Sequence, residues 1–346
     1  MKKFILLTLI LCIVGGAVLY YLVMWAPNMF DGDRVVVISK GETFAEVMNK
    51  LAEQGVIKSK LLFKLAGKLH GSTTRIQIGK YRFHGGMSNL AILEDLAKGT
   101  SVEAIVITIP EGMTTRRITS LLTRQVGIDS ARLMALATNR EFVANLGIDA
   151  PTVEGYLFPK TYRLYWQDAE ELLLQQFIEE FKREFDPMME ARANELGMSI
   201  HDVLTLASIV EGETRIDSER AIIAGVYYNR LRRNMFLQAD PTIQFILPFP
   251  RPLKYSDLNR VSPYNTYRNK GLPPGPVNNP GLASIMAVLY PKKHKYIFFV
   301  ANGLGGHTFT KSYKEHLKAI SNARKLRQER LQMQALADTS DSLQSN

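Results

Sequence analysis

The feature that most constrains this chain is an uncharged, strongly apolar run near its N-terminus, from Phe4 to Pro27. A helix rises about 1.5 Å per residue, so roughly 20 such residues cross the ~30 Å hydrocarbon core of a bilayer. Lys2 and Lys3 precede the run, whereas Asp31 and Asp33 follow it. The positive-inside rule therefore predicts a single-pass protein whose N-terminus is cytoplasmic and whose remaining chain lies on the other side.

Two other interpretations of the run are weaker. A cleaved signal peptide has an apolar core of ~7–15 residues and a cleavage site made of small residues. Here the run is longer, and the sequence around Ala26 is a poor cleavage site. A lipoprotein needs a small residue just before its cysteine, but Cys12 follows Leu11 inside the run. We therefore expect residues 4–25 to remain as a membrane anchor.

Composition narrows the classes of chemistry. Cys12 is the only cysteine, so the chain beyond the run has no thiol for disulfides, zinc binding or cysteine catalysis. A net charge of +10 favours an anionic partner such as lipid headgroups or a cell-wall polymer. The basic residues are scattered, without a Gly-rich phosphate loop or a nucleic-acid motif. The sequence therefore predicts no nucleic-acid partner, no metal and no cofactor.

Beyond residues 1–27, the periodicity predicts an α+β protein in two parts. The linker and first part, 28–100, should form a compact module, with strands at 34–39 and 79–83 and helices at 44–51, 61–69 and 88–96. The second part, 101–336, should be mainly helical with few short strands and long ordered loops. Its clearest predicted elements are one or two helices at 169–196, helices at 200–213 and 218–231, an ordered loop at 255–280 and a buried strand at 296–301. A mobile tail, 337–346, is expected to follow.

Two carboxylates at the end of one predicted helix are the sharpest candidates for chemistry. At ~100° per residue, positions two apart leave a helix on nearly opposite sides. Glu213 continues the apolar stripe that contains Leu206 and Val210, so its carboxyl should be desolvated, with a raised pKa, and suited to general acid catalysis. Glu211 faces away from that stripe, and Arg215 stands four residues on. We expect Glu211 to be a solvated surface acid in a helical ion pair.

Further polar clusters lie later in the chain. Gln238 and Asp240 alternate with other turn residues, and Asp240 is a natural cap for a short helix that starts at Pro241. His307 follows two glycines, and a lone histidine is more often structural than catalytic. The segments 262–267 and 271–276 make a rigid loop with aromatic faces and amide groups, which suit a sugar or a peptide.

Five motifs in a fixed order give this chain a recognisable signature. They read EGYLFPKTY at 154–162, ASIVEGET at 207–214, LQADPT at 237–242, YNTY with GLPPGP at 264–276, and GGHTF at 305–309. In these motifs the chain resembles the YceG-like family, the endolytic murein lytic transglycosylases, over essentially its whole length up to Phe309. The resemblance implies one membrane helix, a small LysM-like module and a catalytic domain.

The resemblance also implies a reaction and its residues. The essential acid of the family is the second glutamate of the ASIVEGET motif, which is Glu213 here, the same residue that the helix geometry favours. The resemblance implies an enzyme that cleaves the bond between N-acetylmuramic acid (MurNAc) and N-acetylglucosamine (GlcNAc) in nascent glycan strands and leaves 1,6-anhydro ends. The residues implied to line the glycan cleft are Gln238, Asp240, Tyr264, Asn265 and Thr266.

The resemblance implies a place and partners as well. The anchor would lie in the inner membrane, with the catalytic domain in the periplasm, in contact with glycan strands and peptidoglycan synthases (penicillin-binding proteins). Two alternatives remain within the sequence evidence. One is a non-catalytic receptor or synthase scaffold tethered to the membrane. The other is a true hydrolase, which requires Asp240 to lie close enough to Glu213 to activate a water molecule.

Overall fold

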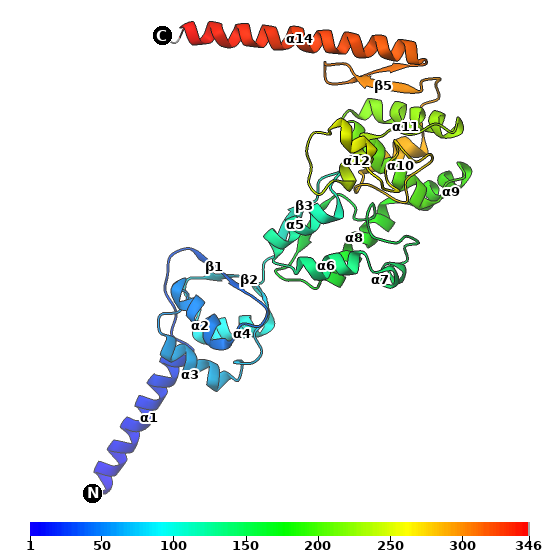
Figure 1. Cartoon of the computed structure of the whole chain (residues 1–346). Coiled ribbons are helices and arrows are strands. Elements are labelled where there is room, and N and C mark those ends of the chain that lie inside the picture. The colour runs from blue at the N-terminus through cyan, green and yellow to red at the C-terminus, as the bar shows by residue number, and fades with distance from the viewer. Residues whose placement is uncertain (345–346) are drawn as a thin grey trace. The chain divides into compact units, whose positions relative to one another are not determined.

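The computed structural model describes residues 1–344, excluding the side chains of residue 331 and of those beyond 332 (Figure 1). The chain forms two compact units. The first comprises Met1–Ile107, Leu121–Ser130 and Thr161–Glu170. The second comprises Thr108–Ser120, Ala131–Lys160 and the described chain from Glu171 onward. The predicted boundaries after residues 27, 100 and 336 remain predictions.

The first unit contains a small α+β module. Its strands β1 and β2 pair antiparallel, with Asp33 opposite His84 and Ile38 opposite Gly79. Side chains from both strands and three helices form one apolar core that includes Leu51, Phe63 and Phe83. The elements are β1 (Asp33–Ile38), α2 (Phe44–Glu53), α3 (Lys60–His70), β2 (Gly79–His84) and α4 (Asn89–Lys98). The predicted mixed helix and strand content of this part is confirmed, while its likeness to LysM remains a prediction.

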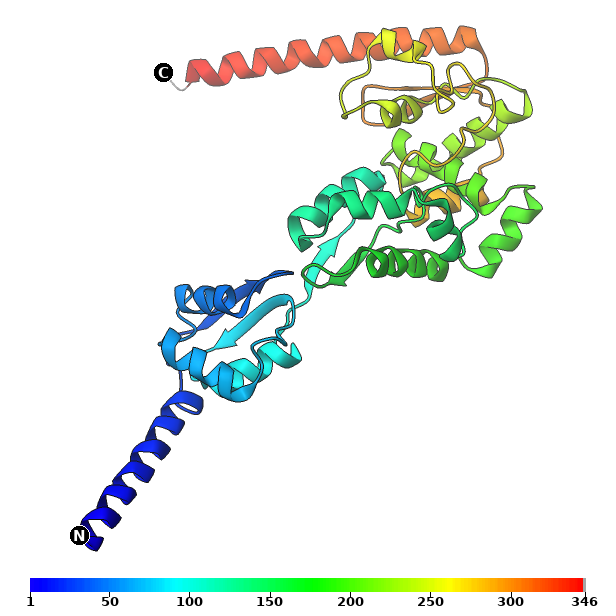
Figure 2. The same ribbon diagram turned by 60° about the horizontal axis from the view of Figure 1, so that its bottom comes forward.

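The apolar run forms α1 (Lys2–Met24), which projects away from the module in both views (Figures 1 and 2). Its most apolar window has a mean hydropathy of 2.5 and no buried residue. Within residues 1–344 it is the one helix long and apolar enough to cross a membrane. Its last residues, Val23 and Met24, are buried in the module core. The Asn89 amide donates to the Val23 carbonyl over 2.8 Å, which ties the helix to the module.

The middle of the chain is mostly helical. Strands β3 (Ile105–Thr108) and β4 (Thr161–Leu164) form a two-stranded sheet. The predicted helical stretch at 169–196 is two helices, because Asp186 caps a new helix that has Pro187 in its first turn. The helices here are α5 (Thr115–Val126), α6 (Ser130–Ala137), α7 (Arg140–Asn145), α8 (Glu170–Glu184) and α9 (Pro187–Glu195).

The core of the second unit is α10 (Ile200–Glu213), whose bounds match the prediction. Every residue from Val203 to Val210 is buried, including Thr205 and Ser208, because other helices pack around it. A helix apolar on all sides belongs in the middle of a domain. The surrounding elements are α11 (Asp217–Arg232), α12 (Asp240–Ile246), the short 3₁₀ helix η1 (Tyr255–Asn259) and α13 (Leu282–Leu289).

A hairpin and a long helix follow. Strands β5 (Phe298–Ala301) and β6 (His307–Thr310) pair antiparallel, with Ala301 opposite His307, and α14 (Tyr313–Gln344) packs on them. The prediction that the strand at 296–301 is buried was wrong, since β5 is only partly buried and all four of its residues line a cavity. The last two residues of the predicted mobile tail lie outside the described residues, and its mobility remains a prediction.

Candidate functional site

The end of α10 opens on a cavity of about 410 Å³ in the second unit. The cavity combines charged groups, aromatic rings and backbone from segments far apart in the sequence. A volume near the lower end of the ~300–1,000 Å³ range typical of ligand sites suits a small polar group. Its lining residues are Glu213, Arg230, Gln238, Asp240, Tyr267, Phe298, Phe299, Val300, Ala301, His307, Tyr313 and His316.

Glu213 is the last residue of α10, and its carboxyl is held by a neighbouring helix. The Tyr227 hydroxyl of α11 donates a 2.6 Å hydrogen bond to its Oε1. Burial raises the pKa of Glu213 to about 7, and the charge of Asp240 adds to this, although the Tyr227 bond opposes it. The predicted desolvation is confirmed. Near neutral pH both forms of the carboxyl are populated, as general acid and base catalysis requires.

Asp240 and Gln238 meet Glu213 around this cavity. Asp240 is the first residue of α12, whose N-cap is Ala239, so Asp240 does not cap the helix as expected. Its Oδ1 instead accepts a 2.6 Å hydrogen bond from the Tyr267 hydroxyl. Gln238 has a φ of +47°, a left-handed conformation that costs energy in a residue other than glycine. The turn before α12 is therefore held in an unusual shape that leaves both side chains exposed at the cavity.

Asn265 and Thr266 are only 0% and 1% exposed and line neither large cavity. The Asn265 amide donates to the carbonyls of Leu258 and Arg260 over 2.9 and 2.7 Å. The Thr266 hydroxyl accepts a 3.0 Å hydrogen bond from the Ala239 amide. In this structure, both side chains fix the loop against the start of α12 and do not reach the cleft surface, in contrast to their expected place.

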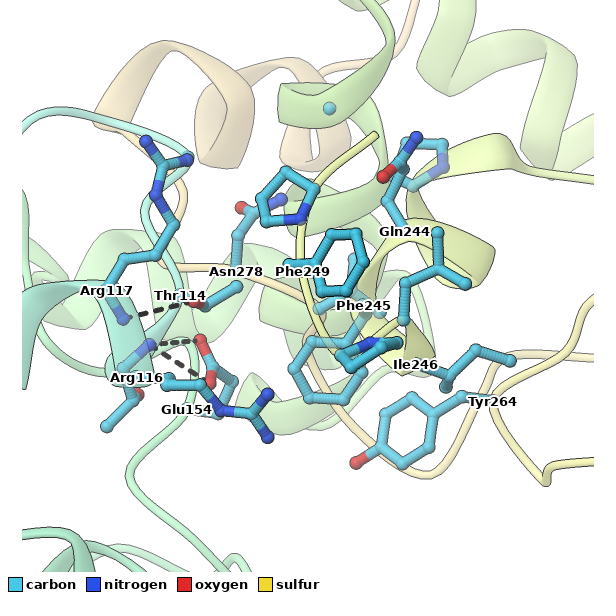
Figure 3. Close-up of a pocket in the computed structure, with 18 of the residues that line it drawn as sticks. Thr114, Arg116, Arg117, Glu154, Gln244, Phe245, Ile246, Phe249, Tyr264 and Asn278 are labelled. Carbon is cyan, nitrogen blue, oxygen red and sulfur yellow. Dashed lines mark hydrogen bonds between the residues drawn. The ribbon is translucent and has the colours of Figure 1, made fainter. Parts of the chain in front are cut away.

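A second and larger cavity, of about 1070 Å³, lies in the same unit and contains the remaining predicted residue, Tyr264. Figure 3 shows Arg116 and Arg117 on one side of it and Phe245 and Phe249 on the other. Gly212 and Pro241 line this cavity. Their chain neighbours Glu213 and Asp240 line the smaller one. The end of α10 and the start of α12 thus form a thin partition between the two cavities.

The expectation for Glu211 was wrong. Its side chain is only 6% exposed and pairs with Arg220 over 3.0 Å, not with Arg215. The Ser284 hydroxyl and the Gly281 amide also donate to its Oε2, over 2.9 and 3.1 Å. Helices α11 and α13 cover this face of α10, which the periodicity of one helix does not reveal. Glu211 is therefore a buried structural acid.

His307 lies at the cavity, a position that the sequence analysis did not predict. It lines the smaller cavity, and its Nδ1 lies 2.7 Å from Oε2 of Glu219, whose Oε1 accepts the His307 backbone amide over 2.8 Å. A Cβ on Gly306 would lie 2.7 Å from that Oε1, so glycine permits the close approach. The two glycines before the histidine were the available signal. The Glu219 carboxylate beside Nδ1 fixes the orientation of the imidazole ring at the cavity.

The cavity therefore offers an acid that can change its protonation state, neutral and charged hydrogen-bonding groups, and aromatic rings. This inventory suits a polyhydroxylated ligand. Within residues 1–344, no three or more His, Cys, Asp or Glu side chains are grouped so as to hold a metal ion.

Comparison with known proteins agrees with the fold and the motifs. The model of the YceG-like family matches residues 36–322. A Bacillus subtilis protein named endolytic murein transglycosylase is 33% identical over 327 residues, covering 89% of this chain and 90% of its own. One of that name from Streptococcus pneumoniae is 28% identical, covering 81% and 56%. A yceG-like crystal structure from Listeria monocytogenes has a TM-score of 0.59 and 31% identity, covering 83% and 98%. This chain belongs to the YceG-like family.

Proposed function

We propose that this protein is an endolytic murein lytic transglycosylase that cleaves the bond between MurNAc and GlcNAc and leaves 1,6-anhydro ends. The observation that carries the proposal is the buried carboxyl of Glu213, with a pKa raised to about 7, in a cavity rich in hydrogen-bonding groups. Relatives in the same family bear the corresponding name. In this proposal, Glu213 is the group that donates and then accepts the proton that the reaction moves.

The reaction needs one carboxyl group acting twice. Protonated Glu213 donates its proton to the glycosidic oxygen while the bond from that oxygen to C1 of MurNAc breaks. The C6 hydroxyl of the same sugar then forms a bond to C1, and the Glu213 carboxylate accepts the hydroxyl proton. The carboxyl is thereby restored, no water is consumed, and the product carries an anhydro ring. A hydrolase would instead need a second carboxylate to activate water.

The neighbours of Glu213 have distinct proposed roles. Tyr227 holds the carboxyl in place through the hydrogen bond to Oε1. Asp240 and Gln238 contact the glycan at the cavity surface. His307, oriented by Glu219, accepts a hydrogen bond from a sugar hydroxyl at Nε2. Asn265 and Thr266 position the loop that shapes the cleft, and Tyr264 contributes from the larger cavity.

The location and partners belong to the same proposal. The N-terminal helix anchors the protein in the inner membrane, with Lys2 and Lys3 on the cytoplasmic side and the catalytic domain in the periplasm. There the substrate is nascent glycan, and peptidoglycan synthases are the expected protein partners. A reporter enzyme that works only outside the cytoplasm, fused after Asn346, should be active. Activity confined to a cytoplasmic reporter would overturn this orientation.

The mass of the product ends tests the reaction itself. The purified full chain should release fragments with anhydro ends, each lighter by one water than a hydrolysed end. Glu213→Gln keeps the shape of the side chain but cannot exchange a proton, so activity should fall by about 10²–10⁴-fold. Glu190→Gln is the control, because Glu190 is exposed and lines neither cavity.

Each other outcome identifies an alternative. Hydrolysed ends would indicate a hydrolase, and Asp240→Asn should then abolish them. Binding of glycan without any cleavage by the unaltered protein would indicate a receptor or scaffold. Near-normal release of anhydro fragments by Glu213→Gln would remove Glu213 from the mechanism.

A further inference from the structure

We propose that the larger cavity binds the peptide that branches from MurNAc in murein, with Arg116 and Arg117 holding the carboxylates of that peptide. This inference rests on the proposed function, because it concerns the substrate of the same enzyme. It adds a binding site for the non-sugar part of the polymer, separate from the cavity that contains Glu213.

One side of the cavity presents two cations. Arg116 and Arg117 belong to the first turn of α5, and their side chains are exposed. Neither makes an ion pair among the described residues, although the charge of Arg116 acts on the Glu154 carboxyl and lowers its pKa slightly against the effect of burial. A third lining arginine, Arg251, is already neutralised by Asp257, which it contacts over 2.7 and 2.8 Å. Planar guanidinium groups bind carboxylates with paired hydrogen bonds. Arg116 and Arg117 are thus the cations available to an anionic ligand.

The one carboxyl that lines the cavity is engaged by protein donors. Both oxygens of Glu154 accept from the Thr115 amide, over 3.0 and 3.1 Å, and Oε1 also accepts from the Asn279 amide over 3.2 Å. Figure 3 shows Glu154 beside Arg116 with these hydrogen bonds to the start of α5. Burial raises the pKa of Glu154 to about 7, which reduces its charge near neutral pH. The net charge of this side of the cavity is therefore positive and comes from the arginines.

The opposite side is apolar. Phe245 and Phe249 face the arginines across the cavity (Figure 3), and Ile246, from the same segment, also lines it. Phe249 is 62% exposed, although an exposed phenylalanine ring lacks a polar group to interact with water. Walls of this kind suit short apolar side chains and peptide backbone more than a continuous row of hydroxyl groups. Two cations facing an apolar wall match a short peptide that carries free carboxylates.

The larger cavity also adjoins the residues around Glu213. Glu213 and Asp240 face the smaller cavity, and their chain neighbours Gly212 and Pro241 face the larger one. A Cβ on Gly212 would lie 2.6 Å from Pro241, so the backbone of α10 and the start of α12 pack closely where the two cavities adjoin. A substituent on a sugar at Glu213 is therefore next to the larger cavity. Murein carries its peptide on MurNAc, the sugar whose bond is cut.

Two forms of one substrate provide the kinetic test. Uncross-linked murein strands are compared with the same strands after an amidase has removed their peptides. The full-length protein should cleave peptide-bearing strands with a KM about 10-fold lower, since charge-assisted hydrogen bonds are the strong ones. Arg116→Ala/Arg117→Ala should raise that KM about 10-fold and abolish the preference, whereas Arg116→Lys/Arg117→Lys should retain part of it. The matched control is Arg232→Ala/Arg233→Ala, which removes two adjacent arginines that line neither cavity.

A binding measurement separates this inference from the proposed function. Equilibrium dialysis of the amidase-released peptide against full-length Glu213→Gln should show binding that the double alanine variant loses. Equal KM values for the two strand types in the unaltered protein, or the same KM increase for both in the variant, would overturn the inference and indicate a glycan or lipid-linked ligand. If the strands are cleaved but the peptide does not bind, the inference fails and the proposed function is retained. If the peptide binds but the strands are not cleaved, the proposed function fails and the peptide site is retained.

Discussion

Glu211 and Glu213 are two residues apart on α10, and both carboxyls are withdrawn from water, yet their surroundings differ in kind. Glu211 meets a full positive charge on Arg220, a hydroxyl and a backbone amide. Glu213 meets one tyrosine hydroxyl and an open cavity. The donors to Glu211 come from α11 and from the start of α13, so this carboxyl holds helices together. A buried carboxyl with too few donors retains a proton that it can transfer.

The strongest test of this contrast is Glu211→Gln. Removing one partner of a buried ion pair leaves the other charge uncompensated, which costs about 3–5 kcal/mol. We expect unfolding free energy to fall by about 3 kcal/mol, near the lower limit, because Arg220 still contacts Asp217. Denaturant unfolding of the full chain in detergent measures it. Glu195→Gln, which breaks an exposed pair with Arg192, should change stability by less than about 1 kcal/mol. Equal losses in the two variants would contradict the contrast.

The pH dependence of stability should report the proton on Glu213. Its pKa in the folded protein is about 7, against an ordinary value near 4.5, so between these pH values the folded state binds more protons than the unfolded state. Stability therefore falls as the pH rises through this window, by about 3 kcal/mol from this group. Glu154 adds a change of the same sign. Denaturant unfolding at pH 5 and pH 8 measures this change. The free energy of unfolding of Glu213→Gln, relative to that of the unaltered protein, should be higher at pH 8 than at pH 5. An unchanged difference would mean that Glu213 is ionised in the folded state.

The residue between the two acids provides the next test. Gly212→Ala places a Cβ about 2.6 Å from Pro241, so the partition must shift at a cost of about 1–3 kcal/mol, with lower activity. In a Pro241→Gly background, the same change should cost less, because the contacting ring is gone. A double-mutant cycle of unfolding free energies measures this coupling. Strict additivity would show that the two positions do not touch.

The smallest expected effect comes from single hydroxyl groups. Tyr227→Phe removes the hydrogen bond that lowers the pKa of Glu213, so the alkaline limb of the pH–rate profile should move to higher pH. The cost should be about 1 kcal/mol, or at most a tenfold loss of rate. Ser284→Ala, the corresponding change beside Glu211, should cost a similar amount of stability and leave the profile in place. A shift of the pH–rate profile in Ser284→Ala would mean that Glu211 also affects catalysis, which would contradict its purely structural role.

Periodicity predicted the elements well where a helix or strand carries its own boundary signals. The bounds of α10 were predicted, and Ser88 caps α4 as expected. Glu213 was correctly expected to be desolvated because it continues an apolar stripe. Glu211 was misplaced by the same method, since a stripe identifies one covered face and α10 is covered on several.

Contacts between distant segments were beyond a sequence argument. Glu219 and His307 are 88 residues apart and meet through two hydrogen bonds. Arg116 and Phe249 line the same cavity from elements separated by most of the unit. Neither pair has a local periodicity, so only the packing of the domain places them together. Of these residues, only His307 lies in one of the five motifs, and that motif does not indicate which side chain His307 faces.

The hairpin of β5 and β6 has a consequence for when the protein becomes an enzyme. Phe298, Phe299 and His307 form one wall of the cavity around Glu213, yet they are made long after α10 along the chain. A chain that ended before this hairpin would lack that wall, so more of the Glu213 carboxyl would contact water. Its pKa would then lie closer to the ordinary value of a glutamate, and less of the protonated acid would be present near neutral pH. The proton that the proposed reaction needs therefore depends on residues made about a hundred positions later in the chain.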